Sequence, residues 1–199
     1  MRMVRLNAWW LCFFMTSCML FPPPRDTAAP TPASQGDALV QPTAAPTSIN
    51  AFMLTSPVVD AGGMLPSVYT CDGDSITLPL AWTNAPADTV SYAVVMHHIP
   101  GPGDEHWYWV LYNIPASISE LAPNSTGIGT LGTNSVNDRN EYAPPCSKGP
   151  GPKTYTYTVY ALSAMPQLPT SGVDRATLLS AIASITLAQA TLDVVYSRP

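Results

Sequence analysis

The alternation of side chains in KTYTYTVYAL, residues 153–162, constrains the fold more than any other feature. In an extended chain, successive side chains point to opposite faces. One face of this segment carries Tyr155, Tyr157, Val159 and Ala161. The other face carries Thr154, Thr156, Thr158 and Tyr160. A two-residue period over ten residues predicts a β-strand.

Other segments share the same strand character, with β-branched and aromatic residues between Pro, Gly, Asn and Asp. We predict strands at residues 78–82, 91–98, 106–115 and 190–198. Along the strand at 106–115, alternation puts His106, Tyr108, Val110 and Tyr112 on one face. Trp107, Trp109 and Leu111 then lie on the other face.

A helical pattern is evident only near the C-terminus. Asp174 is a suitable N-cap, and Leu178, Leu179, Ile182 and Ile185 are spaced for one buried face. Strands and helices do not alternate as a parallel doubly wound sheet requires. We therefore expect a mainly β fold of antiparallel sheets with one or two flanking helices.

The N-terminal region has the character of a targeting segment. Arg2 and Arg5 precede an apolar run over residues 8–21, which predicts a signal peptide over residues 1–21. As a helix this run would span about 21 Å at ~1.5 Å per residue, too short for a stable membrane span. The sequence MTSC ending at Cys18 resembles a bacterial lipoprotein box, in which the cysteine is lipidated.

Residues 22–50 are rich in Pro, Ala and Thr and have no apolar period, so we expect a linker there. The folded domain is then residues 51–199. We expect an exported protein, anchored to a membrane by a lipid on Cys18 and facing the periplasm or the cell exterior. Charged residues make up 11% of the chain and the net charge is -5, which argues against a nucleic-acid partner.

All three histidines lie in MHHIPGPGDEHWYW, residues 96–109. In an extended strand, His97 and His98 point to opposite faces, so only one can face a given site. A long-looped hairpin through residues 99–105 could bring one of them close to His106. The histidine cluster has three possible interpretations: a metal site, a pocket for an anionic or polar ligand, and histidines that only pack at strand ends.

Two further motifs bear on chemistry. Cys71 and Cys146 are the only cysteines of the expected domain, and in an oxidising compartment we expect them to form a disulfide, with two buried thiols as the alternative. GIGTLG at residues 127–132 matches the glycine spacing of a dinucleotide-binding turn. A polar stretch precedes it and no helical pattern follows it, so we do not expect nucleotide binding there.

Four segments, taken in order and spacing, resemble the phosphatidylethanolamine-binding protein family, in its bacterial Raf kinase inhibitor-like branch. They are SPVVDAGGMLPSVYTCDGDSITLPLAW, HWYWVLYNIP, EYAPPC and YTYTVYALS, and the resemblance covers nearly all of residues 51–199. It implies an antiparallel β-sandwich core with flanking helices, and a small cavity for anionic groups such as phosphate head groups. It also implies a mainly non-enzymatic role.

The pocket residues of the family can be matched to positions of this sequence, and several of them differ here. The Asp-Pro-Asp-x-Pro segment of the family falls on residues 96–100, where Pro100 is retained and both aspartates are absent. The pocket histidine of the family falls on Tyr108, and His106 lies two residues earlier. The pocket wall falls on residues 142–146 and includes Pro145 and Cys146. Lys153 replaces the histidine of the His-x-Tyr motif, and Tyr155 keeps its tyrosine.

We therefore predict a non-enzymatic domain without a cofactor that binds a small anionic or polar ligand, such as a phosphate or lipid head group. The predicted ligand-binding residues are His97, His98, Pro100, His106, Tyr108, Pro145, Cys146, Lys153 and Tyr155. One alternative is a metal-dependent enzyme that uses His97 or His98 with His106 and Asp104 or Glu105. The other is a protein-interaction or inhibitor module with a degenerate pocket, acting on a protein target.

Overall fold

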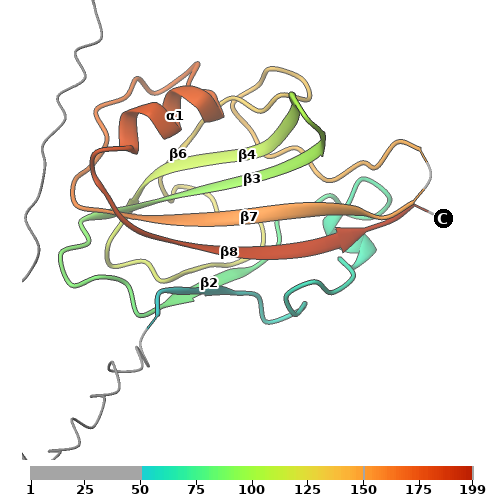
Figure 1. Ribbon diagram of the computed structural model, residues 1–199, viewed down its shortest axis with the longest axis horizontal. Helices are drawn as coiled ribbons and strands as arrows, with labels where there is room; N and C mark the ends of the chain where they lie inside the picture. The colour runs from blue at the N-terminus through green and yellow to red at the C-terminus, as the bar shows by residue number, and fades with distance from the viewer. Residues whose placement is uncertain (1–50, 150, 199) are drawn as a thin grey trace, which may run out of the picture. The chain divides into compact units, whose positions relative to one another are not determined.

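Strand β7 (Lys153–Leu162) forms over the residues that the alternation predicts and pairs on both sides within a five-stranded antiparallel sheet (Figure 1). The computed structural model describes residues 51–149 and 151–198. The sheet order is β6-β4-β3-β7-β8. The other four strands are β3 (Ser91–Gly101), β4 (Asp104–Pro115), β6 (Thr130–Leu131) and β8 (Thr186–Tyr196).

A second antiparallel sheet, of order β1-β2-β5, covers one face of the larger sheet. It consists of β1 (Met53–Thr55), β2 (Leu80–Thr83) and β5 (Glu120–Leu121). Apolar residues of both sheets meet in one core cluster, which includes Leu80, Trp82, Tyr157 and Val159. The odd-numbered face of β7 lies in this cluster, as its alternation predicts.

The opposite face of the five-stranded sheet is covered by helix α1 (Arg175–Ile182) (Figure 1). The Asp174 side chain caps this helix by accepting a hydrogen bond from the Thr177 backbone amide at 2.7 Å. Leu178 and Ile182 are buried against Val95, Val110 and Tyr160, whereas Ile185 lies beyond the end of the helix. A 3-10 turn, η1 (Ser67–Tyr69), precedes β2. The predicted mainly β, two-sheet fold is confirmed.

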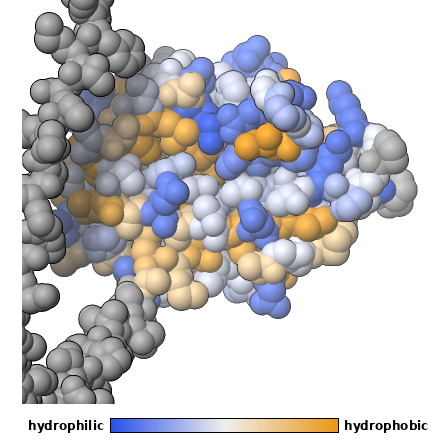
Figure 2. Space-filling view, in the orientation of Figure 1, coloured by the Kyte–Doolittle hydropathy of each residue, from blue (hydrophilic) through white to orange (hydrophobic). Residues whose placement is uncertain are grey.

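Strand β8 is longer than predicted. It begins at Thr186 rather than residue 190 and ends at Tyr196. Its exposed and buried residues alternate from Gln189 to Val194, because one face packs on the core and the other meets solvent. On the face shown in Figure 2, which carries β7 and β8, hydrophobic residues are interspersed with hydrophilic ones.

The predicted faces of β4 are wrong beyond Tyr108. Met96 pairs with Trp109 and His97 pairs with Trp107, so β4 has one residue more than β3 at Tyr108. This β-bulge puts Tyr108 on the same side as Trp109, whereas Trp107 packs with the cluster beneath α1. Strict alternation cannot predict this change of face, because a bulge is defined by pairing with the neighbouring strand.

The connection between β3 and β4 is tighter than the predicted loop. Gly101 pairs with Asp104, which leaves only Pro102 and Gly103 between the strands. Gly103 has φ +78°, and Pro followed by a positive-φ Gly is the sequence preferred in a type II turn. The expected closeness of the histidines is confirmed, since His98 and His106 are direct partners across the hairpin.

The signal peptide, the lipid attachment at Cys18 and the linker over residues 22–50 lie outside the described residues, so they remain predictions. Within the part of the chain that the structure describes, no helix is long and apolar enough to cross a membrane.

Candidate ligand-binding cavity

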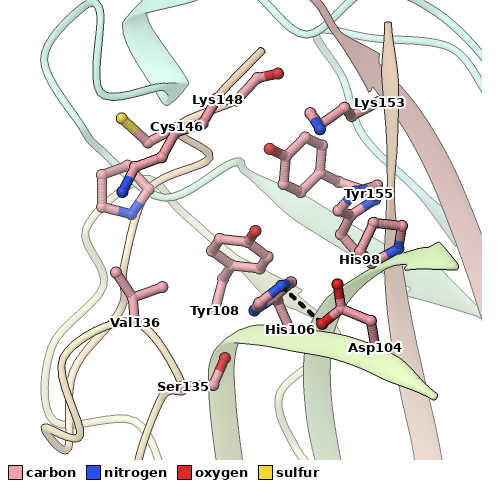
Figure 3. Close-up of a pocket in the computed structure, with 13 residues that line it drawn as sticks. His98, Asp104, His106, Tyr108, Ser135, Val136, Cys146, Lys148, Lys153 and Tyr155 are labelled. Atoms are coloured by element: carbon pink, nitrogen blue, oxygen red, sulfur yellow. Dashed lines mark ion pairs between the residues drawn. The ribbon is translucent and has the colours of Figure 1, made fainter.

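A cavity of about 400 Å³ lies at the hairpin end of β3 and β4, beside the start of β7 (Figure 3). Two irregular segments, residues 135–136 and 144–148, complete its wall. Seven of the predicted ligand-binding residues line it, namely His98, Pro100, His106, Tyr108, Cys146, Lys153 and Tyr155. Asp104, which we considered as a metal ligand, lines it as well.

His98 is held at the cavity by a hydrogen bond from one ring nitrogen, while the other has no partner among the described residues. Its side chain is buried, and Nδ1 lies 2.7 Å from the Thr154 carbonyl oxygen. A carbonyl can only accept, so Nδ1 carries the hydrogen and donates it. Nε2 is buried and has no hydrogen-bond partner in the described part of the chain. The ring packs against Tyr155 with 5.2 Å between ring centroids.

The two tyrosines supply hydroxyl groups to the same cavity. The Tyr108 and Tyr155 rings meet edge to face with centroids 5.3 Å apart, and both hydroxyls are aimed into the space between the labelled residues in Figure 3. Burial raises the pKa of Tyr108, and burial together with the neighbouring Tyr108 raises the pKa of Tyr155. Both phenols therefore keep their protons at physiological pH and can donate hydrogen bonds.

A histidine and a carboxylate lie side by side at the hairpin side of the cavity. His106 Nε2 and Asp104 Oδ1 are 3.2 Å apart, marked by the dashed line in Figure 3. Their side chains are 45% and 62% exposed, so solvent screens the pair and it adds little stability. The Asp104 carboxylate is therefore available to a cationic group that enters the cavity.

The irregular wall brings cationic and polar groups that the sequence reading missed. Lys148 lines the cavity together with Lys153, and these are the only two lysines of the chain. Ser147 is fully buried, lines the cavity, and its Oγ has no partner among the described residues. The scarcity of lysine was the one signal in the sequence that could have drawn attention to Lys148.

The wall is covalently linked to the segment that follows η1. Cys71 and Cys146 form the predicted disulfide, with Cα atoms 5.2 Å apart. The Cys71 backbone amide also donates to the Pro145 carbonyl at 3.0 Å. Pro145 itself is buried behind the wall and does not line the cavity.

His97 lies on the opposite face of β3, away from the cavity, as alternation with His98 requires. Its Nε2 is 4.0 Å from Glu105 Oε1, and Glu105 Oε2 accepts from Arg175 Nη1 at 2.9 Å. Burial and the Arg175 guanidinium lower the pKa of His97. In residues 51–149 and 151–198, no three His, Cys, Asp or Glu side chains are placed to hold a metal ion.

GIGTLG, residues 127–132, contains the short strand β6. The only α-helix among the described residues, α1, begins at Arg175. The dinucleotide-binding arrangement of a turn leading into a helix is therefore not formed at this motif.

Solved structures of known proteins share the fold of this chain. The structure superposes on the crystal structure of a phosphatidylethanolamine-binding protein homologue, CT736, from Chlamydia trachomatis. The TM-score is 0.70 at 26% identity, over 75% of this chain and 99% of that one. The crystal structure of Escherichia coli YbcL gives a TM-score of 0.67 at 25% identity, over 74% of this chain and 99% of YbcL.

Sequence comparison identifies the family. The family model described as phosphatidylethanolamine-binding protein matches residues 55–197. A UPF0098 protein from Methanothermobacter thermautotrophicus is 31% identical over 140 residues, which is 68% of this chain and 92% of the relative. The chain belongs to the phosphatidylethanolamine-binding protein family.

Proposed function

We propose that this protein binds a small ligand carrying a phosphate group in the cavity between His98, Lys148, Lys153 and the two tyrosines, without catalysing a reaction. The observation that carries the proposal is the concentration of the basic side chains. Both lysines and two of the three histidines of the chain line this one cavity.

The cationic side of the cavity suits phosphate oxygens. Lys148 and Lys153 supply ammonium groups, and the tyrosine hydroxyls supply neutral donors with raised pKa values. Hydrogen bonds in which one partner is ionised are shorter and stronger than neutral ones. The unpaired Ser147 hydroxyl adds one more donor in the wall. A ligand that fills these positions relieves the cost of leaving buried polar atoms unpaired.

The hairpin side of the cavity suits a hydrogen-bond donor or a cation. Asp104 supplies a carboxylate, and His98 Nε2 supplies a lone pair when the ring is neutral and Nδ1 carries the hydrogen. A ligand with a phosphate at one end and an ammonium at the other matches this distribution of charge. Phosphoethanolamine has this chemistry, and the name of the family refers to a lipid with the same head group.

The proposed setting is outside the cytoplasm. The signal-like run over residues 1–21, the lipoprotein-like cysteine Cys18 and the Pro-rich residues 22–50 support a domain tethered to a membrane. A tether of that kind would keep the cavity near lipid head groups as well as soluble phosphates.

Chemical protection of the lysines tests the proposal directly, because the chain has only two lysines. The purified full-length chain is acylated at its amines with and without inorganic phosphate, phosphoethanolamine or ethanolamine, and Lys148 and Lys153 are quantified by mass spectrometry. We expect phosphate and phosphoethanolamine to protect both lysines and ethanolamine to protect neither. Tighter binding of phosphoethanolamine than of phosphate would identify the head group as the preferred source.

A charge variant with a matched control completes the test. Lys153→Met should weaken phosphate binding at least about tenfold, because a hydrogen bond to a charged group is worth roughly 1.5–3 kcal/mol. Arg139→Met removes the same charge from an exposed position away from the cavity and should leave binding unchanged. Absence of binding and of protection at millimolar phosphate and phosphoethanolamine, with the fold intact, would refute the proposal.

A further inference from the structure

Two backbone hydrogen bonds and one disulfide link the wall segment around Cys146 to the rest of the fold. On its N-terminal side, the Ala143 backbone amide donates to the Tyr108 carbonyl at 2.8 Å. The Pro145 carbonyl accepts from the Cys71 amide at 3.0 Å. The disulfide to Cys71 follows one residue later.

Among the described residues between Cys146 and β7, the chain has no comparable backbone link. Apart from the strand pairing that begins at Lys153, no backbone hydrogen bond joins residues 147–149 or 151–152 to other described residues. Gly149 and Gly151 have positive φ angles, and a Cβ atom at either would meet nothing within 4 Å. The disulfide is therefore the last covalent or backbone hydrogen-bond link among the described residues before Lys153, and Ser147 and Lys148 follow it directly.

The other end of the disulfide is anchored to the body of the fold. Asp72, next to Cys71, accepts hydrogen bonds from Arg198 Nε at 2.9 and 3.0 Å, and from the Tyr196 hydroxyl at the end of β8. The hydroxyl of Thr70 donates to the Ser67 carbonyl at 2.8 Å. Because the residues on both sides of Cys71 are held by hydrogen bonds, the disulfide restrains the position of the wall.

We propose that the Cys71–Cys146 disulfide is a redox-controlled clamp on the Ser147–Lys148 wall, and that its reduction lowers ligand affinity. This inference rests on the proposed function of the cavity. Both cysteines are partly exposed, so a thiolate can reach the bond. The reductant is a dithiol, either a protein oxidoreductase or a small molecule.

The reduction is an ordinary thiol–disulfide exchange. One thiolate of the dithiol attacks Sγ of Cys146 or Cys71, the S–S bond breaks, and the other cysteine leaves as a thiolate that takes up a proton. The second thiol of the dithiol then loses its proton and attacks the mixed disulfide. The dithiol is oxidised to a disulfide by two electrons, and both protein cysteines become thiols. The wall then loses its covalent link to Cys71.

Limited proteolysis reports on the wall without any ligand. The full-length chain is treated with trypsin before and after reduction by dithiothreitol, and cleavage after Lys148 is followed by mass spectrometry. We expect cleavage after Lys148 to accelerate at least tenfold on reduction and to slow again on reoxidation. Cleavage after Arg139, on the other side of the anchored residues 143–146, should change much less. An unchanged rate at Lys148 would overturn the inference.

Calorimetry with inorganic phosphate measures the effect on the cavity. We expect the affinity for phosphate to fall at least tenfold on reduction. The double variant Cys71→Ser with Cys146→Ser should have the affinity of the reduced protein, and dithiothreitol should not change it. The matched control is Cys12→Ser with Cys18→Ser, which removes the other two cysteines and should keep the redox response. Equal affinity in both redox states would refute the clamp alone. A chain that binds no phosphate in either state would refute the proposed function, while cleavage at Lys148 still decides whether the wall is clamped.

Discussion

Ser147 allows the structure to be tested through a change that should stabilise the protein while impairing it. Ser147 and Ser91 are both fully buried serines, and their hydroxyls differ in hydrogen bonding. The Ser91 hydroxyl donates to the Ala164 carbonyl at 2.8 Å, whereas the Ser147 hydroxyl lies at the cavity without a partner among the described residues. The two Ser→Ala variants should therefore change stability in opposite directions.

The magnitude follows from the cost of an unpaired buried polar group. Leaving a buried hydroxyl unpaired costs roughly 1–3 kcal/mol, so Ser147→Ala should recover about 1 kcal/mol or more. The missing oxygen merely enlarges the existing cavity by about one small atom, at a cost of only a few tenths of a kcal/mol. Ser91→Ala instead leaves the Ala164 carbonyl without its donor and should cost about 1 kcal/mol.

Thermal and urea unfolding measure these changes, and calorimetry with phosphate measures the functional cost. A gain of 1 kcal/mol corresponds to a rise in Tm of about 2–4 °C for a domain of this size. Ser147→Ala should also weaken phosphate binding about tenfold, because it removes a donor to a charged ligand. If Ser147→Ala destabilises the chain as much as Ser91→Ala does, the hydroxyl is paired in solution and the reasoning is wrong.

Three further outcomes follow from the described contacts. Asp174→Ala should lower the unfolding free energy by about 1 kcal/mol at pH 7 by urea denaturation. Because the hydrogen bond from Thr177 lowers the pKa of Asp174 below 3.8, this contribution should be complete above pH 3.8 and vanish as pH falls through the lower folded-state pKa. Burial, then Arg175, lowers the pKa of His97 below 6.5, so the unfolded chain binds its proton first on acidification. The free energy of unfolding should therefore decrease as the pH falls below 6.5. His97→Gln should reduce this pH dependence, and an unchanged pH dependence would contradict the assignment. Leu178→Ala, at a fully buried position under α1, should cost about 2.7–5 kcal/mol by the same denaturation assay, and a loss below 1 kcal/mol would show that α1 is not packed as described.

Much of the local structure could be predicted from the sequence. The alternation in β7 places Tyr155 and Tyr157 correctly in the core between the sheets, and Asp174 caps α1 as its position indicates. The separation of His97 from His98 also follows from the two-residue period of a strand. In each case the information lies in neighbouring residues, and a local rule is sufficient to use it.

The candidate site could be predicted only in part. Residues on the regular strands, such as His98, His106 and Tyr155, reach the cavity as expected. Lys148 and Ser147 enter it from an irregular segment that has no period to interpret, and Pro145 in the same segment is buried behind the wall.

The sequence by itself determined strands β2, β3, β4, β7 and β8, the cap of α1 and the cysteines able to pair, whereas the short strands β1, β5 and β6 were not predicted. Only the tertiary structure decided which face β4 presents, since the bulge at Tyr108 exists through the pairing of Trp107 and Trp109 with β3. It also decided that both lysines lie at one cavity. The physical reason is that a strand period acts between adjacent residues, whereas a bulge and a cavity wall depend on contacts between segments that are distant in the chain.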